Sequence, residues 1–90
     1  MANKYLQNKQ ILQNKLAEII RTERIRKNKS ISLISNEVGM TKSMWADMER
    51  GIKDPQFSTL FRMLEGLEIP LDVLASELQK SLPENFSLID

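Results

Sequence analysis

The chain has 90 residues, a formal net charge of +1, and neither cysteine nor histidine. Its length suits one small globular domain, and the missing residue types exclude disulfides and thiolate nucleophiles and remove the usual zinc ligands and the commonest general base. The motifs GxGxxG, GxxxxGK(S/T) and GxSxG do not occur either, so we expect no enzyme, cofactor, metal site or small-molecule ligand.

Charge is unevenly distributed along the chain. Residues 1–29 contain eight basic and two acidic residues, whereas residues 61–90 contain two basic and six acidic residues. A basic N-terminal part and an acidic C-terminal part are typical of a protein that binds a polyanion with one side, although a solvated run of charge gives the same pattern. Because the sequence has no apolar run of about 18 residues and no basic-then-apolar start, we expect a cytoplasmic protein without a membrane segment.

A first helix is predicted up to Lys27, with Asn28 as a left-handed stop. Its inner face carries apolar residues at helical spacing, namely Leu12, Leu16, Ile19 and Ile20, with Tyr5 as a further candidate. Residues 1–13 are rich in Asn, Gln and Lys and are treated as an N-terminal extension, which is either helical or an arm that becomes ordered on a partner. We expect the domain itself to span residues 14–82 and a C-terminal tail to span residues 83–90.

Two short helices are predicted to meet at a sharp corner. Ser30 or Ser32 caps the first of them, which ends at Gly39, where glycine tolerates a positive φ. Thr41 caps the next helix, which runs to Arg50 and is closed by Gly51.

The two helices of the corner are predicted to share one core. Ile34 and Val38 precede the corner, and Met44 or Trp45 and then Met48 follow it. The small Ser35 on the inward face lets the helices approach closely. We interpret Trp45 as a core residue rather than a base-stacking one, because a lone aromatic on an apolar stripe usually packs.

Two further helices complete an all-α prediction of five helices. After a turn at Asp54-Pro55, apolar residues recur at helical spacing in a fourth helix: Phe57, Leu60, Phe61, Leu64 and Leu67. Pro70 suits the first turn of an extended fifth helix, which Pro83 stops. One stripe of this last helix consists of Leu71, Leu74, Leu78 and Leu82.

Two consecutive segments resemble the lambda-repressor-like helix-turn-helix family, also called the Cro/cI or XRE type: ISLISNEVGMTKSMWADMERG and IKDPQFSTLFRMLEGLEIPLDVL. The resemblance covers about residues 16–75. It is carried by the small residue, the turn glycine, the helix ending, the proline four residues later and the leucine-rich run, which are Ser35, Gly39, Glu49-Arg50-Gly51, Pro55 and residues 71–74.

The resemblance implies a regulator of transcription that binds double-stranded DNA sequence-specifically, as a homodimer on a roughly palindromic operator. Restriction-modification controller proteins are similar in length and in the run from Glu49 onward. Phage Cro-like repressors and DNA-binding antitoxins also remain open.

The resemblance also implies the roles of individual residues. In this family the third helix enters the major groove, so the base-reading positions here are Lys42, Ser43, Met44 and Asp47. Phosphate contacts are implied at Ser30, Ser32, Thr41, Arg50 and Lys53. The chain departs from the family at Ile31, where a glutamine often begins the second helix. Asp47 is unusual as well, since a carboxylate facing phosphates must accept from cytosine or pair with Arg50 or Lys42.

Further expectations concern stability and assembly. Arg24 and Glu49 occupy positions where the family often has an ion pair between the first and third helices. The stripe Leu71, Leu74, Leu78 and Leu82 either closes the core or forms a homodimer surface. The alternative function is a protein-interaction module or antitoxin-like partner-binding protein that keeps this fold with weak DNA affinity.

Overall fold

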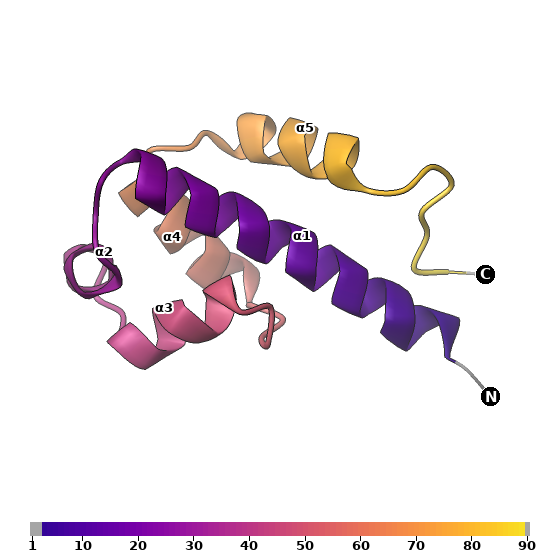
Figure 1. The fold of residues 1–90 in the computed structure, drawn as a ribbon, viewed down its shortest axis with the longest axis horizontal. Coiled ribbons are helices and arrows are strands. Elements are labelled where there is room, and N and C mark those ends of the chain that lie inside the picture. Colours follow the sequence, from indigo (N-terminus) through magenta and orange to yellow (C-terminus); the bar gives the residue numbers. More distant parts are fainter. Residues whose placement is uncertain (1–2, 90) are drawn as a thin grey trace.

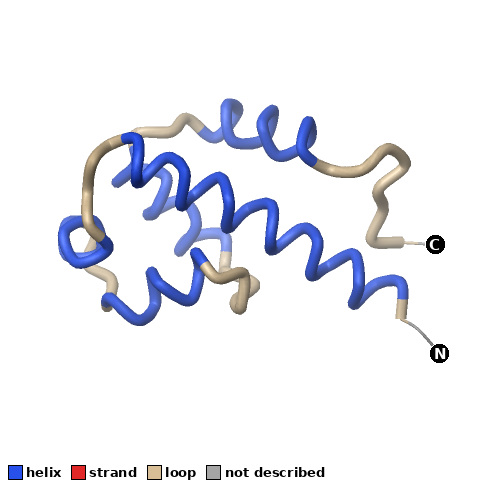
Figure 2. Tube along the Cα trace, viewed as in Figure 1, coloured by secondary structure: helices blue, strands red, loops and turns tan. Residues whose placement is uncertain are grey.

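The computed structural model describes residues 3–89, which form five helices and no strand. The helices are α1 (Lys4–Arg26), α2 (Ile31–Glu37), α3 (Lys42–Glu49), α4 (Phe57–Leu67) and α5 (Leu71–Ser81). Figure 1 shows α1 as a long central rod, with α2, α3 and α4 on one side of it and α5 on the other. The longest stretches outside helices are the α3–α4 connection and the tail after α5 (Figure 2). The all-α prediction is confirmed, and no helix in the described part is long and apolar enough to cross a membrane.

Helix α1 is continuous over 23 residues, so the described part of the N-terminal extension is helix rather than a loose arm. The Asn3 side chain caps it by accepting from the Leu6 amide at 3.1 Å. The helix ends at Arg26, and Asn28 adopts the predicted left-handed conformation with a φ of 58°. Residues 1–2 of the predicted extension lie outside the described residues. The tail folds back beside α1, where the Asn8 side-chain amide donates to the Ser87 carbonyl at 2.7 Å.

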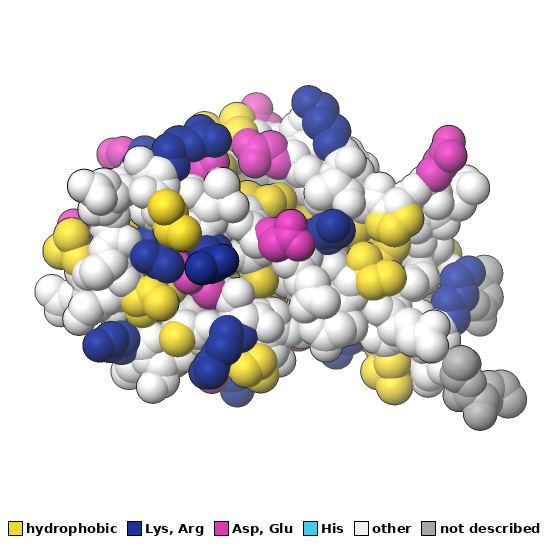
Figure 3. All heavy atoms as spheres, viewed as in Figure 1, with side chains coloured by type: hydrophobic (Ala, Val, Ile, Leu, Met, Phe, Trp, Pro, Cys, Tyr) yellow, Lys and Arg dark blue, Asp and Glu magenta, His cyan; other side chains and the backbone are white. Residues whose placement is uncertain are grey.

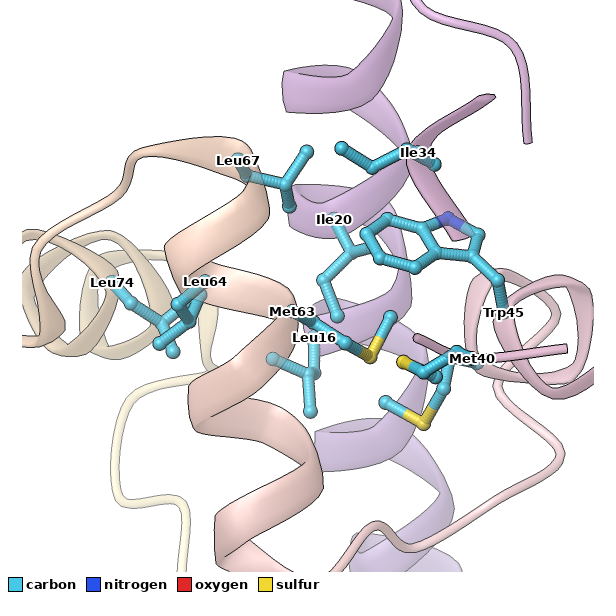
Figure 4. Packing of buried hydrophobic residues seen from close by; sticks show 10 residues of the cluster. Leu16, Ile20, Ile34, Met40, Trp45, Met63, Leu64, Leu67 and Leu74 are labelled. Carbon is cyan, nitrogen blue, oxygen red and sulfur yellow. The ribbon is translucent and has the colours of Figure 1, made fainter. Parts of the chain in front are cut away.

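One apolar core joins all five helices. Figure 4 shows Trp45 of α3 lying beside Ile20 of α1 and Ile34 of α2. Trp45 is fully buried, as predicted. The buried apolar residues are Leu16, Ala17, Ile20, Ile34, Met40, Trp45, Met48, Met63, Leu64, Leu67 and Leu74.

Helix α4 agrees in part with the predicted stripe, since Leu60, Leu64 and Leu67 face the core. Its buried face is formed by Met63, Leu64 and Leu67, whereas Phe57 and Phe61 are 63% and 44% exposed. Both sets recur at helical spacing, and packing against α1 and α2 selects the methionine-containing face.

Helix α5 also differs from the prediction. Pro70 is the N-cap and precedes the first turn, and Leu82 is the C-cap, one residue beyond the helix. The predicted leucine stripe is divided: Leu74 is only 3% exposed and packs next to Leu64, while Leu71 is exposed and Leu78 is half-buried (Figure 4). Leu74 therefore closes this chain's own core and is not available to a second copy.

Candidate nucleic-acid interface

The corner between α2 and α3 is built from two capped helix starts. The Ser30 hydroxyl accepts from the Leu33 amide at 3.0 Å, and the Thr41 hydroxyl accepts from the Met44 amide at 3.0 Å. Between the two helices Gly39 has a φ of 72°, which an L side chain rarely adopts. These contacts fix the direction in which α3 leaves the corner.

The corner also turns its polar residues toward one shallow hollow. Ser35 is buried where α2 meets α3, and its hydroxyl donates to the Ser32 carbonyl at 3.2 Å. A hollow of about 550 Å³ lies beside it, and its lining brings Ser30 and Ser32 of the α2 start together with Lys42 of α3. Three predicted DNA-contacting residues therefore surround one concave surface.

Helix α3 has one face in the core and one in solvent. Trp45 and Met48 are buried, whereas Lys42, Ser43 and Met44 are exposed, Met44 to 46%. The exposed residues are the first three of the helix, so they project from its N-terminal end. Three of the four predicted base-reading residues are thus accessible to a ligand as large as DNA.

The fourth predicted base-reading residue, Asp47, forms an ion pair within the chain. Its carboxylate accepts from the Arg50 guanidinium at 2.8 Å, three residues along the chain. Of the two neighbours considered for it, the partner is Arg50 and not Lys42. The pair reduces the negative potential that Asp47 alone would present, and it also draws Arg50 away from any phosphate.

The remaining predicted phosphate residues differ in what their side chains do. The hydroxyls of Ser30 and Thr41 serve as helix caps, while Ser32 is exposed. Lys53 is exposed in the α3–α4 connection. It lines a second hollow, of about 240 Å³, together with Met44 of the base-reading face.

Ile31, the departure from the family pattern, has a structural role. Its side chain is partly buried and packs against the core. A glutamine at this position would offer a donor to a phosphate, but Ile31 adds apolar contact instead.

A buried ion pair lies beneath the corner. The Arg24 guanidinium donates to both carboxylate oxygens of Glu49, from Nε at 2.5 Å and from Nη2 at 2.9 Å. The Trp45 indole donates to the same carboxylate at 2.6 Å. The two charged side chains are 14% and 5% exposed. The hydrogen bond to Glu49 raises the pKa of Arg24 and outweighs burial, which lowers it.

The bond from Trp45 to Glu49 is a contact that sequence reasoning missed. The two residues are four apart on one helix, a spacing that brings side chains together and that offered a signal for it. A second missed group consists of Gln10, Gln13 and Asn14 of α1, which contact Gly51 at the end of α3. Gln10 and Gln13 lie in the N-terminal extension and Asn14 directly follows it, and no motif marks them.

The basic N-terminal segment is largely paired within the molecule. Five of its basic residues form ion pairs with carboxylates, namely Lys9, Arg24, Arg26, Lys27 and Lys29. Several Lys and Arg side chains nevertheless gather on the part of the surface over α2 and α3 (Figure 3). Basic side chains therefore lie near the corner, although most of those in the first 29 residues are paired with carboxylates.

Comparison with known proteins agrees with this architecture. The family model HTH_3, described as helix-turn-helix, matches residues 20–74. A solved structure of an HTH_3 family transcriptional regulator from Vibrio cholerae is similar in fold, with a TM-score of 0.71 and 23% sequence identity over 87% of this chain. The likeness covers 47% of that protein, so this chain spans about half of its length. No curated protein matches the sequence.

The matched family region extends from the core of α1 to Leu74 and includes more than half of the chain. It contains the corner, the exposed start of α3 and the ion pair between Arg24 and Glu49. The chain belongs to the HTH_3 helix-turn-helix family, the lambda-repressor-like, XRE-type group.

Proposed function

We propose that this protein regulates transcription by inserting α3 into the major groove of a specific double-stranded DNA operator. The observation that carries the proposal is the division of α3 into a buried face, with Trp45 and Met48, and an exposed N-terminal face, with Lys42, Ser43 and Met44. A rigidly anchored helix with a free polar end matches what direct reading of base edges requires.

Each exposed residue of α3 has a suitable chemistry. Lys42 donates to guanine O6 and N7, Ser43 bonds to either a donor or an acceptor, and Met44 contacts a thymine methyl group. Asp47 acts mainly by holding Arg50, and the neutralised pair allows α3 to approach the phosphates that flank the groove.

Phosphate contacts position the protein on the duplex. Ser30 and Ser32 at the start of α2, Thr41 at the start of α3, and Lys53 after α3 lie around the exposed face of α3. Arg50 stays paired with Asp47 in this arrangement and is not among them. These contacts supply affinity without reading sequence.

The proposal includes a homodimer, since two α3 helices about 34 Å apart would read successive major grooves. The α4–α5 patch, defined here as Phe57, Phe61 and Leu71, is the exposed apolar surface suited to pairing. The rings of Phe57 and Phe61 lie 6.2 Å apart, and Phe61 and Leu71 line a hollow of about 320 Å³. Leu78 and Leu82 are half-buried and remain candidates, whereas the buried Leu74 does not.

The DNA proposal is tested with duplexes selected from a random pool. We expect nanomolar binding that weakens steeply as salt rises, and a loss of about 1–3 kcal/mol with relaxed base preference for Lys42→Gln. Lys80→Gln is the matched control, because Lys80 is an exposed lysine of α5, across α1 from α3 (Figure 1). Fluorescence anisotropy measures both variants, and equal losses for Lys42 and Lys80 would contradict a base-reading role.

A second candidate is a protein-interaction module, which includes an antitoxin-like role. The ion pairing of the basic segment and the apolar Ile31 favour it, because both reduce what the surface offers to phosphates. Absence of binding to any duplex at about 50 mM salt, where phosphate attraction is strong, would select this candidate.

A further inference from the structure

Two glutamines of α1 contact Gly51, the second residue after the end of α3. The side-chain amides of Gln10 and Gln13 donate to the Gly51 carbonyl at 3.0 Å and 3.1 Å. Gln10 also donates to the Asn14 side-chain oxygen at 2.8 Å. We call Gln10, Gln13 and Asn14 the α1 clamp.

Gly51 has a conformation and surroundings that favour glycine at its contact with the α1 clamp. It is buried, its φ is 72°, and a Cβ atom at this position would collide with the Asn14 side-chain oxygen. Any other residue would therefore strain the backbone at this φ and displace the Asn14 side-chain oxygen from its place. Two donors on one carbonyl and a positive φ that favours glycine make this a specific junction rather than a chance surface contact.

The junction controls the segment that follows it. Ile52, Lys53 and Asp54 are all exposed, so no apolar anchor holds these three residues in place. Their position depends on polar contacts: the clamp on Gly51, the Ile52 amide donating to the Asp47 carbonyl at 3.2 Å, and the Lys9 ammonium 3.5 Å from the Asp54 carboxylate. Two of these three contacts come from the first half of α1.

Lys53 lies between the two points that α1 holds. It lines a hollow together with Met44, so it lies beside the base-reading face of α3. A lysine side chain is long and flexible, and it meets a particular phosphate reproducibly only when its backbone is held.

We infer that Gln10 and Gln13 are positioning residues for DNA binding, which hold the α3–α4 connection so that Lys53 meets a phosphate. The inference rests on the proposed function. Both glutamines precede residue 20, where the matched family region begins, so the α1 clamp is a feature of this chain outside that region.

A double-mutant cycle tests the inference. The four proteins are the parent, Lys53→Gln, the paired change Gln10→Met with Gln13→Met, and the combination of all three. Methionine keeps the side-chain length and the helix propensity but has no amide donor. Gln7→Met, at an exposed position of the same helix, is the matched control. Affinity for the selected duplex is measured between about 50 and 200 mM salt, together with the circular dichroism and melting temperature of each protein.

We expect Lys53→Gln to weaken binding by at least about threefold at low salt and to make the slope of log affinity against log salt shallower by about 0.9, the value for one lost phosphate contact. The paired glutamine change shifts affinity and slope in the same direction, by up to the same amount. In the Lys53→Gln background it has no further effect, because the contact it positions is already gone. A purely structural role would lower the melting temperature without changing the salt slope.

Other results overturn the inference and remain distinguishable from failure of the proposed function. One contrary result is that Lys53→Gln weakens binding and the paired glutamine change does not. Another is that the two changes together reduce affinity by the product of their separate factors. Either result shows that the clamp does not act through Lys53, while DNA binding itself is still supported. If the parent binds no duplex, the proposed function fails and the inference fails with it. If the paired variant is unfolded at the assay temperature, Gln10→Met and Gln13→Met are tested singly, since each leaves one donor on the Gly51 carbonyl.

Discussion

At the scale of single residues, Glu49 connects more of the molecule than any other charged side chain described above. Its carboxylate accepts from two nitrogens of Arg24 on α1 and from the indole of Trp45 in the core. Arg24 in turn donates to the Lys29 carbonyl at 2.9 Å, in the connection that leads to α2. One buried carboxylate thus links α1, α3 and the entry to the corner.

We expect Glu49→Ala to lower stability by on the order of 3–5 kcal/mol, because it leaves the Arg24 charge and the Trp45 donor buried without their acceptor. For a domain of this size, that corresponds to a fall in melting temperature of roughly 12 °C or more. Glu68→Ala is the control, since Glu68 is 76% exposed and pairs with Lys27 at the surface. Thermal unfolding followed by circular dichroism compares them, and a melting curve for Glu49→Ala that matches the parent would rule out this role.

At the scale of elements, α2 and α3 have only seven and eight residues, which is too short for either helix to be stable alone. Their caps and their shared buried face therefore decide whether they form. The sequence allows either Ser30 or Ser32 as the cap of α2, because it does not fix the residue at which the first turn begins. The structure assigns the cap to Ser30, while the Ser32 side chain remains exposed.

This assignment gives a matched pair of variants. Ser30→Ala removes the acceptor of the Leu33 amide and is expected to cost about 0.5–2 kcal/mol. Ser32→Ala is expected to stay within about 0.5 kcal/mol of the parent, as surface changes usually do. Urea unfolding measures both free energies, and a loss for Ser32→Ala as large as that for Ser30→Ala would refute the assignment.

At the scale of the whole molecule, the sequence was sufficient to predict five helices, the corner, the buried Trp45 and the family. Those features depend on local rules of capping, glycine conformation and periodicity. The faces of α4 and α5 were not predictable in this way. Helix α4 has apolar residues on several sides, so its periodicity allows more than one buried face, and only packing against α1 and α2 selects Met63 over Phe57. Packing of α5 against α1 likewise draws Leu74 inward.

The exposed α4–α5 patch makes a prediction about assembly. We expect the parent to sediment as a dimer at tens of micromolar protein, roughly the range of weak association, and Phe61→Ser to sediment as a monomer. Leu6→Ser is the control, because Leu6 is a similarly exposed apolar residue in the first turn of α1. That end of α1 lies away from α4 (Figure 1). A parent that remains monomeric at this concentration, or equal effects of both changes, would contradict pairing through this patch.

The junction between α1 and Gly51 also determines how much of the chain can be transplanted. A designer who grafted residues 20–74 onto another scaffold would carry the corner, α3 and Lys53, but would leave behind Gln10, Gln13 and Asn14. The Gly51 carbonyl would then face solvent, and the connection after it would lose its outer support. The smallest segment that retains this support begins near Lys9, ahead of the boundary that family likeness alone would suggest.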